Sequence, residues 1–226
     1  SEKLNDFELG WRFKNQTTSL NTNLYYMSYK DQLVLTGAID DVGAPIRTTS
    51  GESYRIGLEI DAHLELTDHF TLRPNIAIST NKNLDFVSSW DGELVQLGTT
   101  NISFSPNFIA ANALIYQSKN NLQFSMLSKF VGKQYMGNID RKNSLLDSYF
   151  VQDLNASYEI KPMRIFKSIV ISALINNLFN TQYISNGYYY TYEDTWSVEG
   201  ATTTVDGAGY YPQATRNFLL GLALKF

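Results

Sequence analysis

Alternation of apolar and polar side chains is the dominant pattern along this chain. In the clearest segment, residues 54–66, every second residue from Tyr54 to Leu66 is apolar, and most of the residues between them are charged. Successive side chains of a β-strand point to opposite faces, so this segment predicts a strand with one apolar face and one charged face. Strands of soluble proteins usually have about 5–6 residues, whereas tilted membrane-spanning strands need about 9–11. The length and the alternation together favour a membrane-spanning strand.

The same period recurs along the chain and predicts strands near 6–14, 19–34, 54–66, 70–82, 107–117, 122–136, 148–161, 167–180 and 214–226. Their connections alternate between short (14–18, 67–69, 118–121, 162–166) and long (35–53, 83–106, 137–147, 181–213). Outer-membrane barrels have short periplasmic turns and longer extracellular loops. The fold class that we predict is therefore all-β, an antiparallel up-and-down transmembrane β-barrel. Pro74 lies on the apolar side of its strand and has no N–H, which predicts a local irregularity there.

The order of short and long connections also predicts the direction in which each strand crosses the membrane. The last strand follows a long connection, so we expect it to descend from outside and to leave the C-terminus in the periplasm. Nine strands cannot close on themselves with antiparallel neighbours throughout, and bacterial single-chain barrels have even strand numbers. Open strand edges cannot face lipid, because their N–H and C=O groups would have no partners. We therefore expect strands from outside this chain to complete the barrel.

Composition agrees with a barrel wall that is apolar outside and polar inside. Apolar residues make up 43% and charged residues 18%, with 15 Tyr and 13 Phe, against roughly 25% charged in soluble domains. The net charge of −4 gives no electrostatic case for binding nucleic acid, and the absence of Cys excludes disulfides and thiolate metal sites. The apolar stretch 169–175 is too short for a membrane-spanning helix. The start of the chain lacks the features of a signal peptide, so we expect export to be directed by residues outside it.

Several short motifs carry a resemblance to a known family. NNLFNTQY at 176–183 and PQATRNF at 212–218 resemble the signatures that flank the last loop of TonB-dependent outer-membrane receptors, and ELGW at 8–11 and DLNASY at 153–158 resemble earlier strand motifs. YMGN at 135–138 and SNGY at 185–188 resemble the Bacteroidetes branch. The resemblance implies that residues 1–226 are the C-terminal portion of the barrel domain, about the last nine strands of about 22 around an N-terminal plug. The plug, the TonB box and the earlier strands lie outside this chain.

The resemblance also implies a function and partners. We expect active import of a scarce nutrient, such as an iron–siderophore or haem, with no enzymatic activity and no cofactor. The expected partners are the TonB–ExbB–ExbD energy-coupling system through the plug, outer-membrane lipid, and the barrel assembly machinery. The C-terminal strand resembles the signal that this machinery reads, with Phe218, Leu220, Leu222, Leu224 and Phe226 on one face. An alternative is that the chain is a folding substrate of that machinery. A soluble β-sandwich or solenoid is a third possibility, which the long strands disfavour.

Aromatic residues around the last long connection form the candidate ligand site. By resemblance, Tyr188, Tyr189, Tyr190, Tyr192 and Trp196 would grip a ligand at the extracellular mouth. The alternative is an aromatic girdle at the membrane boundary, which would include Tyr183, Tyr210 and Tyr211.

Acidic residues give no metal site and no catalytic centre. Alternate residues of one strand are about 6.6–7 Å apart, so Glu59, Asp61, His63 and Glu65 cannot chelate one ion by themselves, and we expect them to face a polar lumen. The loop acids match no compact calcium loop. These are Asp40, Asp41, Glu193, Asp194 and Asp206. Neither a phosphate-binding loop nor a Ser/His/Asp order stands out.

Overall fold

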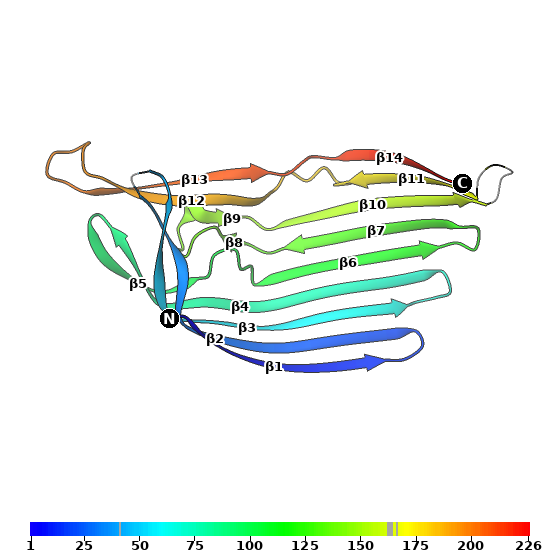
Figure 1. Ribbon diagram of the computed structural model, residues 1–226, viewed down its shortest axis with the longest axis horizontal. Coiled ribbons are helices and arrows are strands. Elements are labelled where there is room, and N and C mark those ends of the chain that lie inside the picture. The colour runs from blue at the N-terminus through cyan, green and yellow to red at the C-terminus, as the bar shows by residue number, and fades with distance from the viewer. Residues whose placement is uncertain (41, 162–164, 166) are drawn as a thin grey trace.

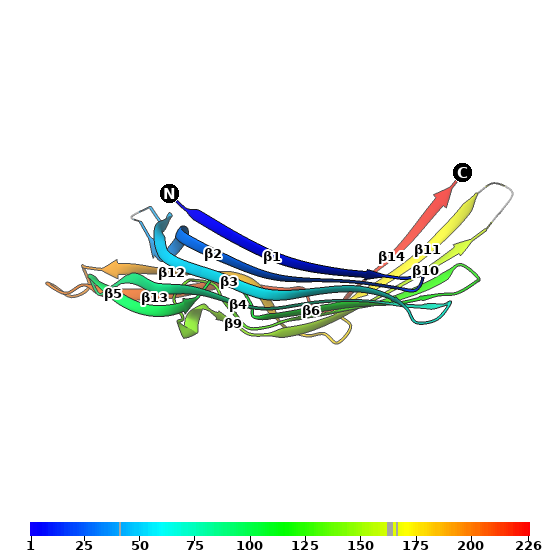
Figure 2. The same ribbon diagram turned by 90° about the horizontal axis from the view of Figure 1, so that it is seen from below.

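A curved antiparallel sheet runs the length of the molecule (Figure 1). The computed structural model describes residues 1–40, 42–161, 165 and 167–226. Nine strands pair in chain order and form a continuous wall, which confirms the predicted meander. They are β1 (Lys3–Lys14), β2 (Thr18–Ile39), β3 (Pro45–Glu65), β4 (Phe70–Trp90), β6 (Phe108–Gln117), β7 (Leu122–Val131), β10 (Tyr149–Ile160), β11 (Ser168–Asn176) and β14 (Asn217–Lys225). Figure 2 shows both outer edges, β1 and β14, rising to the same side, so the wall is an open trough and the barrel is not closed within this chain.

The long connections differ from the loops that the sequence predicted, because three of them are β-hairpins. β2 and β3 continue beyond the wall, β4 continues into β5 (Glu93–Asn101), and β12 (Ile184–Asp194) pairs with β13 (Thr203–Pro212). The fourth connection holds β8 (Gln134–Tyr135), the 3₁₀ turn η1 (Lys142–Ser144) and β9 (Leu145–Leu146). Of the short turn predicted at 162–166, residues 162–164 and 166 lie outside the described part of the chain.

The strand register sorts side chains into two faces. On the apolar face, the ring of Tyr116 lies 5.0 Å from Phe70 and 6.4 Å from Phe124, toward the short turns. Toward the long connections, Phe108 and Phe130 lie 5.7 Å apart, centroid to centroid. The band between these two aromatic levels is largely aliphatic, as in the lipid-facing surface of an outer-membrane barrel, and one polar row crosses it, formed by Asn112, Ser128 and Gln152.

Pro74 interrupts the ladder between β3 and β4. The register runs from Asp61↔Asn75 directly to Leu64↔Leu72 and skips the two pairs between them. Proline cannot donate a ladder hydrogen bond, so the irregularity predicted from the sequence is confirmed.

The β2–β3 hairpin bends away from the wall and crosses the end of the trough (Figures 1 and 2). Two residues with positive φ, Asp31 at 55° and Gly37 at 91°, interrupt the regular pairing of β2. Such irregularities bend a strand and increase its twist. The bend brings Ala38 to Thr191 of β12, where the two strands share one parallel bridge. No helix among the described residues has the length and apolar character needed to cross a membrane.

Candidate functional site

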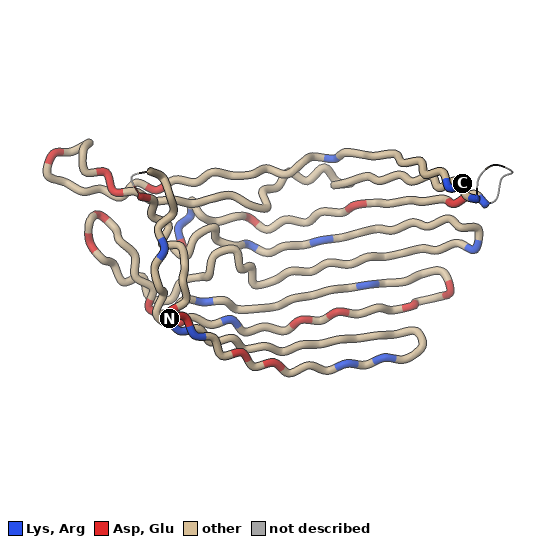
Figure 3. Tube along the Cα trace, viewed as in Figure 1, with Lys and Arg blue, Asp and Glu red and all other residues tan. Residues whose placement is uncertain are grey.

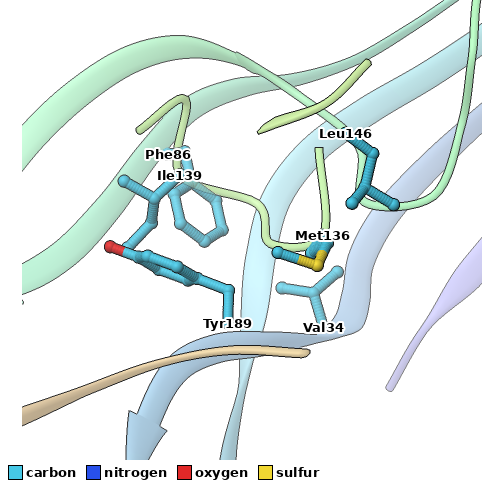
Figure 4. Close-up of a cluster of buried hydrophobic side chains, with 6 residues drawn as sticks. All are labelled: Val34, Phe86, Met136, Ile139, Leu146 and Tyr189. Atoms are coloured by element: carbon cyan, nitrogen blue, oxygen red, sulfur yellow. The ribbon is translucent and has the colours of Figure 1, made fainter. Parts of the chain in front are cut away.

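The hairpins at the end of the trough are held together by a buried apolar cluster (Figure 4). Its centre is the segment between β7 and β10, which packs against β2, β4 and β12. Phe86 and Leu146 are only 1% and 2% exposed, although most large apolar side chains of the wall are open. The cluster comprises Val34, Phe86, Met136, Ile139, Leu146 and Tyr189. Burial of these side chains therefore fixes the hairpins relative to one another.

Asn138 is the polar centre of this packing. Its carboxamide oxygen accepts hydrogen bonds from the Ser103 backbone N–H at 3.0 Å and from Asn83 Nδ2 at 3.3 Å. Its Nδ2 donates to the Leu35 carbonyl at 2.9 Å. Since the side chain is 2% exposed, these bonds satisfy groups that water does not reach.

Direct hydrogen bonds also join the hairpin tips. The Asp91 backbone N–H donates to Thr204 Oγ1 at 2.6 Å, and the Thr204 N–H donates to Asp91 Oδ1 at 2.6 Å. The Ser89 hydroxyl donates to Glu193 Oε1. The β4–β5 and β12–β13 hairpins are therefore latched to each other at their far ends.

The aromatic residues predicted to bind a ligand are divided between two faces of β12. Tyr188 and Tyr190 stack with centroids 6.1 Å apart, and the Tyr190 ring lies over Gly207, where an added Cβ would stand 2.6 Å from Cζ. Tyr189 points the other way into the buried cluster and donates from its hydroxyl to Asp206 Oδ2 at 3.3 Å. Burial, together with the Asp206 carboxylate, raises the pKa of Tyr189, so the phenol stays protonated.

Tyr192 and Trp196 line a cleft of about 860 Å³ between the three hairpins. Their rings are parallel within 4°, with centroids 6.0 Å apart, and Trp196 is 70% exposed. Asp40 and Glu193 line the same cleft, together with residues that no sequence pattern had singled out, such as Ser89. These residues come from separate hairpins, so only the packing of the tips brings them together.

Trp196 is held by a turn around Asp194. Asp194 Oδ1 accepts hydrogen bonds from the backbone N–H groups of Trp196 and Ser197, both at 3.0 Å. Hydrogen bonds from Ser197 lower the pKa of Asp194, so this carboxylate is ionised near neutral pH.

Polar residues on the other face of the wall form hydrogen-bonded pairs. Asn21 Nδ2 donates to Asp61 Oδ1 at 3.4 Å, and Asn23 Nδ2 donates to Glu8 Oε2 at 3.3 Å. Glu59 and Asp61 line a shallow cleft of about 610 Å³ on this face. Across the described residues, no group of three or more His, Cys, Asp or Glu side chains is placed to hold a metal ion. Asp41 lies outside the described residues.

The NNLFN motif links the end of β11 to the segment before β14 through the hydrogen bonds of Asn177. Asn177 has a φ of 51°, and its Nδ2 donates to the carbonyls of Thr181 at 2.8 Å and Ala214 at 3.2 Å. Its Oδ1 accepts from the Thr181 N–H at 2.8 Å, while its own N–H donates to Asp153 Oδ1 at 2.7 Å. Asparagine tolerates this left-handed backbone and can both donate and accept, which explains why this residue type suits the position.

The C-terminal strand β14 pairs with β11 and places its even-numbered side chains on the apolar face. Phe218 lies opposite Ile175, and Leu222 lies opposite Ile171. Leu220 is 84% exposed and Leu222 is 67% exposed within this chain. The predicted assembly-signal residues thus extend the apolar face of the wall to its last strand. Phe226 follows β14 and is assigned to the same face because it continues the alternation of Phe218, Leu220, Leu222 and Leu224.

These features define a segment of the wall of a transmembrane β-barrel: one apolar face with two aromatic levels, one polar face, and interlocked hairpins at one end. A comparison with protein families agrees. The family described as "TonB dependent receptor-like, beta-barrel" matches residues 1–178, and the chain belongs to this family. TonB-dependent receptors are outer-membrane transporters rather than enzymes, and the family is coupled to TonB. In a sequence search, no curated protein matches the chain.

Solved structures of receptors share this fold. The ferric yersiniabactin uptake receptor FyuA from Yersinia pestis superposes with a TM-score of 0.67 at 17% identity, covering 98% of this chain and 29% of FyuA. The ferric-catecholate import receptor Fiu from E. coli K12 gives 0.66 at 16% identity, covering 97% and 27%. The siderophore receptor PiuA from Acinetobacter baumannii gives 0.65 at 18% identity, covering 97% and 28%. The chain therefore spans less than a third of the length of these receptors.

Proposed function

We propose that this chain forms the C-terminal nine strands of the barrel of a TonB-dependent importer for a scarce nutrient, such as an iron–siderophore or haem. In this proposal the long hairpins face the cell exterior and the C-terminus lies in the periplasm. Strands outside the chain complete a barrel of about 22 strands around a plug that contacts TonB–ExbB–ExbD. The observation that carries the proposal is the cleft of about 860 Å³ among interlocked hairpins on one end of a two-faced wall.

An uptake experiment with the complete receptor tests this function. Cells that carry the receptor would be offered ⁵⁵Fe bound to citrate, to ferrioxamine or to a catecholate siderophore, and haem in a separate assay. We expect uptake of at least one of these that is lost without TonB, and that falls when residues 187–209 are replaced by a short turn. Entry of each probe at equal rates with and without TonB would contradict the proposal, because it would indicate a passive pore.

A second candidate function is that the chain is a folding substrate of the barrel assembly machinery. Its support is β14, which pairs with β11 alone among the described strands and presents Leu220 and Leu222 on its apolar face. An exposed strand edge is a template for pairing with another chain. Deletion of Phe226 should weaken co-purification with the assembly machinery, and unchanged co-purification would exclude this role for the C-terminal strand.

A further inference from the structure

The hairpins at the proposed mouth are strongly acidic. Connections 35–53, 83–106 and 181–213 contain ten acidic residues and one basic residue, Arg47. Asp and Glu positions gather on the hairpins at this end of the molecule (Figure 3). The ten acidic residues of these connections in the sequence are Asp40, Asp41, Glu52, Asp85, Asp91, Glu93, Glu193, Asp194, Glu199 and Asp206, of which Asp41 lies outside the described residues. A surface with one sign of charge attracts ligands of the opposite sign and repels ligands of the same sign.

The cleft at this end combines negative charge with a flat aromatic surface. Asp40 and Glu193 line it beside Tyr192 and Trp196, and neither Lys nor Arg is among the residues that line it. The parallel Tyr192–Trp196 pair leaves Trp196 largely exposed. Carboxylates near an exposed indole face form a site that favours organic cations, which gain both charge pairing and cation–π attraction.

A second, smaller cleft adjoins the first, and a buried residue with an unpartnered hydroxyl lines it. This cleft of about 470 Å³ shares Ala38, Ile46 and Ser89 with the larger one. Ser50 lines it and is 3% exposed, and within the described part of the chain Ser50 Oγ has no hydrogen-bond partner. A buried hydroxyl without a partner is costly, so a ligand that reaches it with a donor or an acceptor gains a hydrogen bond.

The same end of the molecule already holds a cation on an indole ring. The guanidinium carbon of Arg141 lies 3.7 Å from the centroid of the Trp90 ring. The Trp90 site is occupied by the protein's own side chain, whereas Trp196 is open.

We propose that the two adjoining clefts bind an organic cation with a flat face, which stacks on Trp196, pairs with Asp40 and Glu193, and extends a polar group toward Ser50. This inference rests on the proposed import function and specifies its substrate class. It disfavours polyanionic chelates as ligands of the larger cleft, because they would meet carboxylates and no Lys or Arg there, whereas the smaller cleft is lined by both Arg47 and Asp85.

Three flat pyridines of similar size and different charge provide the probes. The N-methylnicotinamide used is the one methylated on the pyridine ring nitrogen (1-methylnicotinamide) and is cationic, nicotinamide is neutral and nicotinate is anionic, and the cation quenches indole fluorescence when it stacks. With the complete receptor in lipid nanodiscs, we expect saturable quenching by N-methylnicotinamide, weaker binding of nicotinamide and no saturable binding of nicotinate. Trp196→Ala should abolish the saturable component.

Charge variants test the carboxylates. Asp40→Asn together with Glu193→Gln should weaken N-methylnicotinamide binding roughly tenfold. Glu199→Gln is the matched control, because Glu199 is acidic and exposed in the same connection but does not line the cleft. Nicotinate binding as tightly as the cation, or an unchanged affinity in the double variant, would overturn the proposal.

A calcium titration separates the cation class from a metal site. If Ca²⁺ displaces N-methylnicotinamide, and Trp196→Ala leaves the binding of Ca²⁺ unchanged, then the carboxylates hold a metal ion and the proposed organic cation is wrong. The outcome of the uptake experiment does not depend on the outcome of these binding experiments. TonB-dependent uptake without binding of the cation would refute this substrate class alone, whereas TonB-independent entry would refute the import function.

Discussion

Replacement of Asn177 by alanine tests how the NNLFN motif works. The side chain is 4% exposed and makes three hydrogen bonds, two to Thr181 and one to Ala214. The substitution removes all three while the backbone N–H can still donate to Asp153. It also places a Cβ-bearing residue other than asparagine at a φ of 51°.

The expected destabilisation follows from these contacts. Each lost hydrogen bond contributes about 1 kcal/mol net, with more where a buried group keeps no partner. Alanine in the left-handed region adds about 1 kcal/mol. We therefore expect Asn177→Ala to lower the free energy of unfolding by about 3–4 kcal/mol. Asn177→Gly should cost about 1 kcal/mol less, because glycine adopts positive φ freely.

The assay is urea unfolding of the complete receptor in lipid vesicles, followed by loss of the compact band on unheated gels. Asn120→Ala is the matched control, since Asn120 is exposed in a turn and its carboxamide has no hydrogen bond to another described residue. A control of this kind should change stability by less than about 0.5 kcal/mol. The reasoning is refuted if Asn177→Ala is no worse than the control. If Ala and Gly are equally destabilising, the backbone part of the explanation is wrong.

Three further substitutions test the wall and the latched hairpins. Leu222→Arg on the apolar face should cost about 2–4 kcal/mol and reduce the folded receptor in outer membranes, whereas Ala223→Arg on the polar face should be tolerated; equal loss would contradict the face assignment. Asp91→Ala removes the carboxylate that accepts the Thr204 N–H, while the backbone N–H of residue 91 can still donate to Thr204 Oγ1, and it should speed hydrogen exchange at amides 195–206; unchanged exchange there would show that the carboxylate does not hold the two hairpins together. Asn138→Ala should cost about 2–3 kcal/mol and expose segment 133–148 to proteolysis, and a resistant segment would argue against its linking role.

The wall was predictable from the sequence because its physics is local. A strand with lipid on one side and a polar lumen on the other must alternate, so the period alone located all nine strands. The largest differences lie at the long-connection end, where β2, β3 and β4 extend beyond the predicted bounds and β7 and β11 end before them. The β4–β5 hairpin was missed although a signal was present. Asp91 and Gly92 both have positive φ, 53° and 78°, and an Asp-Gly pair between β-forming residues favours a type I′ turn.

The candidate site could not be assembled from the sequence, because it depends on contacts between distant segments. Tyr188, Tyr189 and Tyr190 read alike in the sequence, yet Tyr189 is buried among side chains from three other segments while its neighbours stack on the opposite face. The cleft likewise joins Asp40 to Trp196 through one bridge, Thr191↔Ala38, that no periodicity indicates. Residue types were informative about chemistry but not about which face each ring would take.

The continuity of the strands limits how the mouth can move. β2 runs from Thr18 to Ile39, so its hydrogen-bonded ladder extends from the wall into the cleft without a flexible loop between them. A ligand that shifts Asp40 must therefore either bend β2 at its two positive-φ residues, Asp31 and Gly37, or break ladder bonds with β3. Bending is the less costly route, because the pairing is already irregular there. Ligand-linked motion should then be hinged between residues 31 and 37, with the wall strands below that level unchanged.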